Sequence, residues 1–481
     1  MSNTSDTLAR RAFLQRLGHL GVAGVATPWA LNLAAMSDAA AQTGGYKALV
    51  CVFLLGGNDN GNTVIPYDST GHSAYVNARG GLIAASGSDG LAIARDQIIP
   101  LNGTGLSGSQ QWGLPRELSG LANLFHSGKL AVQMNVGPLI RPTTLDDYKA
   151  RTSLPPKLFS HNDQQSIWQS SRAEGSVQGW GGTLGDLTLG SNGRSAFTCM
   201  SVAGNAVFLS GATALQYQIG TNGAIAISPI TNRGSMFNSD ACSNALRTLM
   251  TEVRSNLLEH ELNTIVQRSW SNQATLSSAI ASSATQFDSM LPDSPTLSVN
   301  GSNVAFTNLR LNRQLKMVAR IIEARERLGM QRQVFMVTLG GFDNHDRLYA
   351  NHASLLAQVN AALVGFQAAM ESIGAGDIVT TFTASDFGRT ITSNGDGSDH
   401  GWGGHHFVMG GAVKGKAFYG TPPSAIMGGA EDVGNGRYIP STSVDQYAAT
   451  MAKWFGVPDA QMAMIAPNLA NFSTRDLGFM R

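Results

Sequence analysis

Carboxylate and imidazole side chains gather just beyond several apolar segments of this sequence. The set comprises three acids and three histidines: Asp59, Asp343, His345, Asp386, His400 and His405. A carboxylate oxygen is a hard anionic ligand and a neutral imidazole nitrogen is a borderline one, and sites that mix the two suit Zn, Mn or Fe. If the fold brings these residues together, they predict a divalent metal site.

Each of these residues also has an ordinary structural explanation. An Asp after a strand is often a turn former or a helix cap. His405 and His406 would then simply flank a strand, and the helical spacing around His352 favours the surface of a helix over a metal site. The prediction therefore depends on the convergence of the whole set rather than on any single residue.

Ser160 and Arg389 are candidate catalytic residues with structural alternatives. Ser160 precedes polar residues typical of a first helical turn, so we expect it at the N-cap. A hydroxyl at a helix amino terminus can also be a nucleophile, because the free N–H groups stabilise an attacked anionic ester. Arg389 lies just beyond Asp386, where it would pair either with an anionic substrate or within an internal salt bridge.

The elements that must position these residues alternate along the chain. Apolar runs that predict buried strands span residues 48–55, 130–136, 334–339 and 378–383. Helical patterns span residues 312–328, 352–373 and 443–455. This alternation predicts an α/β fold with a largely parallel central sheet and helices on both faces. Ligands bind at the carboxyl ends of such strands, and Asp59, Asp343 and Asp386 all fall at that edge.

Residues 203–310 differ from the rest of the chain. They are rich in Ser, Asn, Thr and Gln and contain no apolar run that ends in an acid. We expect an insertion or a cap over the sheet rather than an independent domain. Residues 42–481 would then form one α/β domain.

The first 41 residues resemble an export signal. Arg10-Arg11 followed by Phe13-Leu14 is similar to the twin-arginine motif, and a moderately apolar stretch leads to small residues at 39–41, with cleavage expected before Gln42. An amphipathic amino-terminal helix that happens to carry two arginines is the alternative. No later stretch is long and apolar enough to be expected to cross a bilayer. We therefore predict a periplasmic or extracellular protein delivered by the twin-arginine translocase.

Composition excludes one class of partner and leaves the cysteines open. The chain has 33 basic and 32 acidic residues, and without the three arginines and two aspartates of the leader 30 of each remain. This balance argues against a nucleic-acid partner. Cys51, Cys199 and Cys242 are odd in number and widely spaced. One disulfide between two of them is possible in principle, but three buried thiols are favoured.

Several blocks occur in an order that resembles a known family. They are Leu55-Gly56-Gly57-Asn58-Asp59, Phe159-Ser160-His161, Gly179-Trp180-Gly181-Gly182, Gly340-Gly341-Phe342-Asp343-Asn344-His345, Ser385-Asp386-Phe387-Gly388-Arg389-Thr390 and Asp399-His400-Gly401. With the twin-arginine leader, the chain resembles the bacterial "domain of unknown function 1501" family, whose exported proteins are placed in the alkaline phosphatase and sulfatase superfamily. The resemblance implies an alkaline phosphatase-like fold over nearly the whole mature chain.

The same resemblance implies roles for individual residues. Ser160 would be the nucleophile at a helix start, and a divalent metal (Zn, Mn, Ca or Mg) would be bound by a set of acids and histidines: Asp59, Asp343, His345 and Asp386, completed by His400 or His405. Three departures matter. The acid–histidine spacing after Gly341 is shorter than the usual four residues. Active phosphatases usually have Asp-His where this chain has Asp386-Phe387, and no cysteine lies in the context that sulfatases oxidise.

Two functions of different class follow. The leading hypothesis is an exported metal-dependent hydrolase of a phosphate or related anionic ester, with a small anionic ester as substrate. The alternative is a non-catalytic exported protein that keeps the fold and binds a partner protein or an envelope glycan. Whether the chain is an enzyme stays open at this point.

Overall fold

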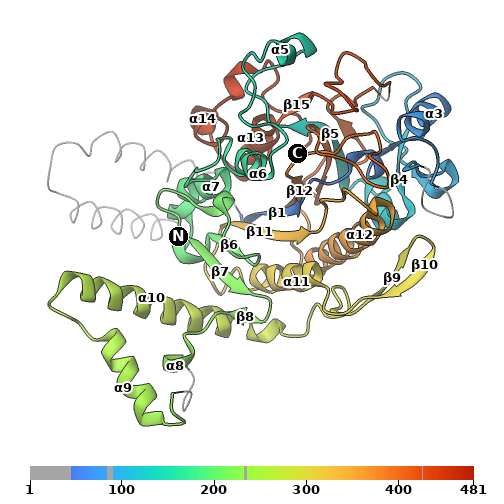
Figure 1. The fold of residues 1–481 in the computed structure, drawn as a ribbon. Helices are drawn as coiled ribbons and strands as arrows, with labels where there is room; N and C mark the ends of the chain where they lie inside the picture. The colour runs from blue at the N-terminus through green and yellow to red at the C-terminus, as the bar shows by residue number, and fades with distance from the viewer. Residues whose placement is uncertain (1–44, 84–89, 232–235, 425) are drawn as a thin grey trace, which may run out of the picture.

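The computed structural model describes residues 45–83, 90–231, 236–424 and 426–481. The predicted export signal at residues 1–41 lies outside these residues. Within them the chain folds around one large sheet with helices on both faces (Figure 1). The predicted α/β class with a largely parallel central sheet is confirmed.

The central sheet contains ten strands of the described residues. Nine of them follow the order β14 (Phe418–Tyr419), β5 (Leu130–Gly137), β13 (Gly404–Met409), β12 (Val379–Ser385), β1 (Lys47–Leu55), β11 (Arg332–Gly340), β6 (Cys199–Ser201), β7 (Gln216–Gly220) and β8 (Gly223–Ala224). The tenth, β15 (Thr442–Ser443), also pairs with β5. Strands β12, β1, β11, β6 and β7 are mutually parallel, whereas β13 runs antiparallel between β12 and β5. All four predicted strands are present, and the sheet is mixed because β13, whose run contains two histidines, and β8 run antiparallel to their neighbours.

Strand β1 shows why the sheet is buried on both faces. Its alternate residues point to opposite sides, so that Ala48, Val50 and Val52 join one hydrophobic cluster while Leu49 and Cys51 join the other. A strand with apolar residues at every position is stable only between two layers of helices. The continuous apolar run in the sequence is therefore the direct consequence of this placement.

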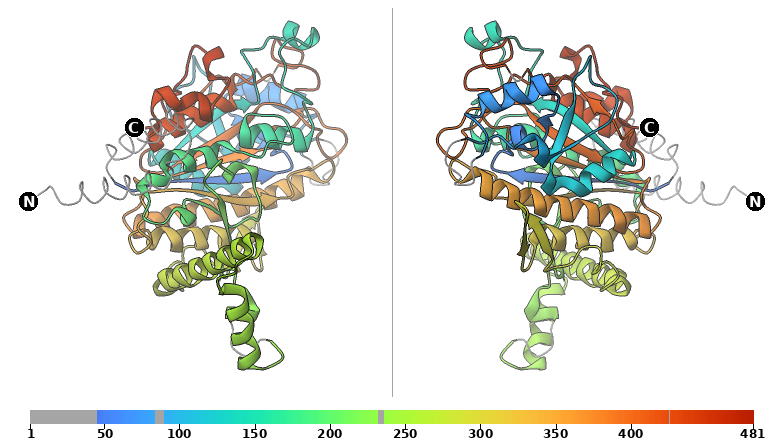
Figure 2. Two further views of the ribbon diagram at one scale, coloured as in Figure 1. Left: turned by 90° about the vertical axis from the view of Figure 1, so that its left-hand side faces the viewer. Right: turned by 90° about the vertical axis from the view of Figure 1, so that its right-hand side faces the viewer.

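Two groups of helices cover the two faces, as Figure 2 shows. On one face lie α4 (Ser119–His126), α10 (Leu257–Ile280), α11 (Arg310–Glu323) and α12 (Leu348–Ser372). On the other lie α6 (His161–Ser170), α7 (Trp180–Thr188), α13 (Val444–Phe455) and α14 (Met462–Ile465). Helix α12 is long and apolar enough to cross a membrane by length and composition, but two thirds of its apolar 18-residue stretch is buried in the protein.

The region 203–310 is inserted between β6 and α11. Strands β7 and β8 extend the central sheet, and β9 (Thr296–Val299) and β10 (Ser302–Ala305) form a separate hairpin. Between β8 and β9 in the sequence, α8 (Ser228–Thr231), α9 (Asp240–Thr251) and α10 form an arm, of which α9 projects from the body (Figure 2). Helix α10 packs against α9, α11 and β8, so this part of the insertion lies beside the sheet.

A small sheet and the cysteines complete the fold. Strand β4 (Trp112–Pro115) pairs with β2 (Ile65–Pro66) and β3 (Ile98–Pro100), next to α3 (Ser69–Ala78). Each of the three cysteines is a free thiol: Cys51 and Cys199 are buried, and Cys242 is half-buried. The favoured prediction of free thiols is confirmed, although only two of them are buried.

Candidate metal centre

The loops that follow β1, β11 and β12 meet at the carboxyl edge of the sheet. Gly56 has a φ of +117°, and a Cβ atom there would lie 2.4 Å from the backbone nitrogen of Asp343. Only glycine permits this approach between the loops after β1 and β11. The loop after β12 folds back on itself through a backbone bridge between Arg389 and His400. As a result, His400 lies beside Asp343.

Three imidazoles converge on the carboxylate of Asp343. The Nε2 atoms of His345 and His400 lie 3.0 and 3.3 Å from Asp343 Oδ1, and that of His161 lies 3.4 Å from Oδ2. The Nε2 atoms of His345 and His400 are only 3.0 Å apart. One ligand atom from each of His161, Asp343 and His400 lies within 4.8 Å of the others. These four residues, His161, Asp343, His345 and His400, are called the histidine cluster below.

The other ring nitrogen of each histidine faces a hydrogen-bond acceptor. Nδ1 lies 2.7 Å from Asp386 Oδ2 in His161, 2.7 Å from the carbonyl oxygen of Phe159 in His400, and 3.2 Å from Asp399 Oδ1 in His345. We therefore assign the proton to Nδ1 in all three neutral rings, which leaves the Nε2 lone pairs free. Acceptors in this position orient metal-binding histidines and raise their basicity.

Two observations test whether the cluster fits a cation. His161 Nε2 is buried and has no hydrogen-bond partner, which is costly for a polar atom removed from water. The facing lone pairs of His345 and His400 repel unless a proton or a cation lies between them. A divalent metal bound by these nitrogens and by Asp343 relieves both conditions, so the donor set fits a metal.

Asp386 supports the cluster from below. Its carboxylate is fully buried and accepts hydrogen bonds from His161, from Nε2 of Gln165 at 2.7 Å and from the backbone N–H of Gly56 at 3.2 Å. The hydrogen bond to Asp386 is the largest factor that raises the pKa of His161, against the opposing effect of burial. Asp386 was predicted as a metal ligand, and in the structure its carboxylate contacts His161 Nδ1.

Arg389 is part of the same buried layer. Its guanidinium is inaccessible to solvent and donates to Asp343 Oδ1 at 2.9 Å, to the carbonyl of Gly56 at 3.0 Å and to the carbonyl of Ser398. Of the two roles considered for Arg389, the structure contains the internal ion pair. Partial burial acts to raise the pKa of Asp343, but the hydrogen bond and charge of Arg389 outweigh it and lower that pKa.

Phe387 packs against two of the imidazoles. Its ring centroid lies 4.8 Å from that of His161 and 4.6 Å from that of His400, and it packs under Gly57, where a Cβ would lie 2.4 Å from the ring. An apolar floor thus holds the two imidazoles in place. One of these imidazoles, His161, comes from the first turn of α6.

The carbonyl that orients His400 belongs to a strained residue. Phe159 has a φ of +72°, a left-handed conformation that costs a non-glycine residue about 1–2 kcal/mol. Ser160 follows as the N-cap of α6, as predicted, but its side chain makes no capping bond to the backbone. Instead Ser160 Oγ donates to Asp163 Oδ2 at 2.8 Å, and Asp163 is buried.

Two predicted ligands lie apart from the cluster. Asp59 forms a buried ion pair with Arg79 at 2.5 Å and accepts the N–H of Gly61. His405 is buried against Trp112, and its Nδ1 accepts the backbone N–H of Asn135 at 3.0 Å. The structure therefore does not bring Asp59 or His405 to the histidine cluster, because each already has a partner within the core.

His161 is the cluster residue that we did not predict as a ligand. Its signal in the sequence was weak, since it stands in a polar stretch far from the strands that end in acids. Asp399, which orients His345, was also not predicted for any role. The sequence signals that could have identified these two residues are the block Phe159-Ser160-His161 and the pair Asp399-His400.

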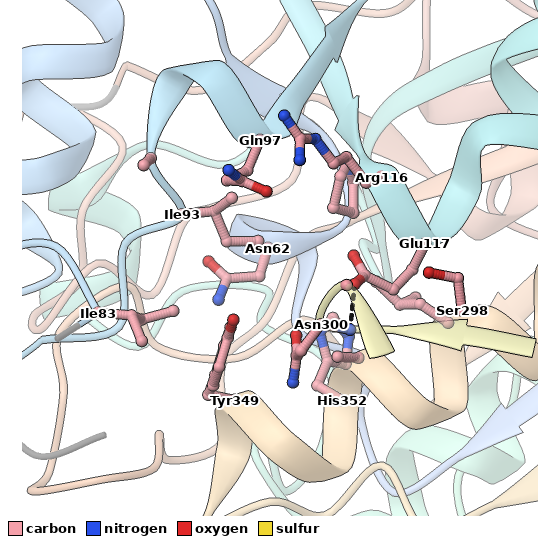
Figure 3. A pocket seen from close by; sticks show the side chains of 15 residues that line it. Asn62, Ile83, Ile93, Gln97, Arg116, Glu117, Ser298, Asn300, Tyr349 and His352 are labelled. Carbon is pink, nitrogen blue, oxygen red and sulfur yellow. Dashed lines mark hydrogen bonds between the residues drawn. The ribbon is translucent and has the colours of Figure 1, made fainter. Parts of the chain in front are cut away.

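A cavity of about 300 Å³ lies on the other side of the loop after β1 (Figure 3). Its lining includes Asn62, Glu117, Asn300 and Tyr349, with the Glu117 carboxylate accepting the N–H of Asn300 at 2.9 Å. His352 also lines it, although its side chain is almost entirely buried and contacts Asn58 Oδ1 at 2.9 Å. The expected position of His352 on the helix surface is wrong, because α12 packs under this loop. None of the residues that line the cavity belongs to the histidine cluster.

Comparisons with known proteins identify a family but no activity. The family model described as "Protein of unknown function (DUF1501)" matches residues 46–467. No curated protein matches the chain. Among solved structures, crystal structures described as Ps i-CgsB, one in complex with k-i-k-neocarrahexaose, are similar with TM-scores of 0.34 and 10% identity. The similarity covers 89% of this chain and 77% of each of those chains, and it is too distant to indicate a function.

Proposed function

The chain belongs to the DUF1501 family of proteins of unknown function, and on the geometry of its histidine cluster we propose that it is a metal-dependent hydrolase of a phosphate or related anionic ester. The metal part of the proposal rests on the cluster. The ester part rests on the resemblance of the sequence blocks to the alkaline phosphatase and sulfatase superfamily. The carrying observation is that three Nε2 atoms, each with its Nδ1 placed against an acceptor, face one carboxylate.

The donor set narrows the choice of metal. Ca²⁺ and Mg²⁺ prefer oxygen ligands throughout, whereas three imidazoles and one carboxylate suit Zn²⁺ or another transition metal such as Mn²⁺. When bound, such an ion acts as a Lewis acid and lowers the pKa of a coordinated water. Of the metals considered from the sequence, we propose Zn or Mn.

The residues of the site divide into an accessible layer and a buried layer. The side chains of Asp343 and His345 are about half exposed, and those of His161 and His400 are a quarter exposed or slightly more. Asp386 and Arg389 are buried beneath them. A substrate therefore reaches the accessible layer, while Asp386 orients His161 and Arg389 holds Asp343 ionised. Arg389 acts as a positioning residue in this proposal, not as a partner of the substrate.

Ser160 remains a candidate nucleophile with a specific test. Its hydroxyl is held by Asp163, so attack by Ser160 requires that this hydrogen bond be exchanged. Attack by water requires no such change. Ser160→Ala abolishes hydrolysis if the serine attacks, and leaves most of it if water attacks.

The experiment is a metal analysis of the mature protein combined with a panel of phosphate monoesters, phosphate diesters and sulfate esters. We expect about one metal per chain and hydrolysis of one ester class, both lost in Asp343→Ala. Asp476→Ala is the matched control, since the Asp476 and Asp343 side chains are 43% and 45% exposed and the carboxylate of Asp476 contacts Lys453 and the Gly478 N–H at the surface. A mature protein that is metal-free after gentle purification and inert toward the panel would refute the proposal.

A second candidate function is supported by a different part of the molecule. Binding of a partner protein or an envelope glycan is favoured by the exposed apolar residues of the inserted arm and by the cavity of Figure 3, which has a mixed polar and apolar lining. Under this alternative, deletion of residues 203–310 abolishes function and Ser160→Ala has no effect.

Export by the twin-arginine route, which carries folded proteins, fits a metal loaded before export and is part of the leading proposal.

A further inference from the structure

The arm of the insertion carries an unusual density of exposed apolar side chains. At its tip, Val253, Leu257 and Leu258 are 80%, 84% and 83% exposed. Along α10, Leu262 and Ile265 are each 52% exposed. Figure 2 shows that α9 stands clear of the body. Contiguous exposed apolar surface of this kind marks an interaction site in a natural protein.

The side of α10 that faces α9 already has its contacts within the arm. Asn256 caps the helix, and the buried Asn263 donates to the carbonyl oxygens of Leu249 and Glu252 at 3.1 and 2.6 Å. These bonds fasten the end of α9 to α10. Val266 is buried on the same side. The exposed residues therefore belong to a separate outer face and are not a loosely packed interior.

The outer face has the spacing of a helix–helix contact. Leu258, Leu262 and Ile265 stand at positions i, i+4 and i+7, which lie on one face of a helix. Among the described residues, no segment packs on this stripe. Beside it, on one flank, lie Glu261 and Arg268, whose side chains are more than 60% exposed and whose charged atoms are 3.8 Å apart.

We propose that a second copy of this chain covers this stripe, with the two α10 helices antiparallel about a two-fold axis. Centred between Asn263 and Thr264, this arrangement sets Leu262 against the partner's Ile265 and Ile265 against the partner's Leu262. Antiparallel helices bring the same flank of each together, so Glu261 meets the partner's Arg268 and Arg268 meets the partner's Glu261. The surface is thus self-complementary in shape and in charge, as a two-fold interface must be.

The charge pattern argues for a second copy over a lipid surface. Helices that lie on membranes usually carry Lys and Arg on their polar face. The exposed charged positions of α10 include both Glu259 and Glu261 beside Arg268. The inference is independent of the histidine cluster and would stand if the proposed hydrolase activity failed.

The test uses two charge reversals on the mature full-length chain. In Glu261→Arg every interchain pair becomes Arg against Arg, and in Arg268→Glu it becomes Glu against Glu. We expect the wild type to dimerise with a micromolar dissociation constant and each variant alone to dimerise about tenfold more weakly. In an equimolar mixture the two variants form a heterodimer in which both interchain pairs again join opposite charges. The mixture therefore recovers wild-type affinity. Because mixing cannot repair the pair within one chain, recovery assigns the effect to the interface.

Apolar variants and controls complete the experiment, read by sedimentation velocity over a range of concentrations. Leu262→Glu is expected to be monomeric, while Val177→Glu, at a site 80% exposed outside the arm, dimerises as the wild type does. Unchanged circular dichroism and Tm confirm that these surface variants fold. A wild type that is monomeric at all concentrations overturns the proposal, as does a dimer insensitive to Leu262→Glu or a mixture without recovery. Monomeric protein that instead sediments with vesicles of anionic phospholipid assigns the stripe to a membrane and also overturns it.

Discussion

The histidine cluster and the buried pair His405-His406 contain the same side chain in opposite states. In the cluster, His161, His345 and His400 are partly exposed, and each Nδ1 faces an acceptor. His405 is almost fully buried, and its Nδ1 itself accepts a backbone N–H. The neutral ring of His405 therefore carries its proton on Nε2, whereas the cluster histidines carry it on Nδ1.

This difference shows what turns a histidine into a candidate ligand. A free Nε2 lone pair arises only when a carbonyl or a carboxylate occupies the Nδ1 side. Burial by itself works the other way, since desolvation lowers the pKa of His405 to about 3 and that of His406 to about 3 and leaves both rings neutral inside the core. Position next to a strand end is thus not sufficient, and the partner of Nδ1 decides the role.

The contrast between the two groups of histidines is tested most directly by substituting members of each group and measuring the bound metal. We expect His161→Ala and His400→Ala to lose stoichiometric metal, since each removes a converging Nε2. His405→Asn should keep it, because the amide oxygen replaces Nδ1 as acceptor of the Asn135 N–H. Metal content per folded chain, measured by elemental analysis, checks this. Equal loss in all three variants would show that the cluster is not the metal site.

Asp59 extends the comparison to the carboxylates. Asp59→Ala leaves Arg79 buried without its counter-charge, and both side chains are at most 1% exposed. We expect a loss of about 3–5 kcal/mol in the free energy of unfolding, with no change in metal content per folded chain. Urea denaturation measures the first and elemental analysis the second. Arg79→Met in the same chain should recover part of the stability, and metal loss without destabilisation would make Asp59 a ligand after all.

The fold was predictable because its signals are local. The runs at 48–55, 334–339 and 378–383 are apolar at nearly every position, and only a strand between two helical layers buries such a run. The meeting of Asp343 with Asp386 and its neighbours followed from the same parallel topology. His405 and His406, expected to flank a strand, lie within β13, because burial against Trp112 and Trp168 makes these two imidazoles acceptable inside the sheet.

The site was predictable only in part because its selection depends on long-range contacts. His161 reaches the cluster from α6, more than 180 residues before Asp343 in the sequence, and its role follows from a hydrogen bond to Asp386. Asp59 stands at the predicted edge, yet Arg79 from α3's C-terminal end takes its charge. The sequence around His161 does not indicate its partner Asp386, and the sequence around Asp59 does not indicate its partner Arg79. Residue type and position at a strand end predicted which edge of the sheet holds the site. The side-chain contacts determine which residues belong to it.

The buried layer offers a finer test of the same comparison. Asp386→Asn keeps the shape of the side chain but weakens its hold on the His161 Nδ1–H, so we expect metal affinity to fall about 10–100-fold. Asp399→Asn should cost less, since Asp399 is 43% exposed and its bond to His345 is longer, at 3.2 Å. Competition with a fluorescent chelator measures both affinities. If Asp386→Asn and Asp399→Asn leave affinity unchanged, the acceptors do not orient the ligands.

The smallest effect expected concerns pH and the core histidine. The pKa of His405 in the folded chain is lowered by burial to about 3, below its value of roughly 6.5 in an unfolded chain. Above pH 6.5 neither state binds the proton, and the neutral ring carries no penalty. As the pH falls below 6.5, the unfolded chain binds a proton that the folded chain does not, so stability decreases until the pH approaches 3.

His405→Asn removes this titration and should therefore flatten the dependence of stability on pH. Between about pH 7 and pH 5 we expect the variant to lose about 1–2 kcal/mol less than the wild type, measured by urea denaturation at each pH in the presence of a chelator so that metal release does not contribute. The lost packing against Trp112 lowers the stability of the variant at every pH, so the informative quantity is the slope. His406 stays in place, and its own pKa of about 3 preserves part of the acid sensitivity. Identical slopes would mean that His405 is protonated in the folded state, and the contrast between the core pair and the histidine cluster would then lose its electrostatic basis.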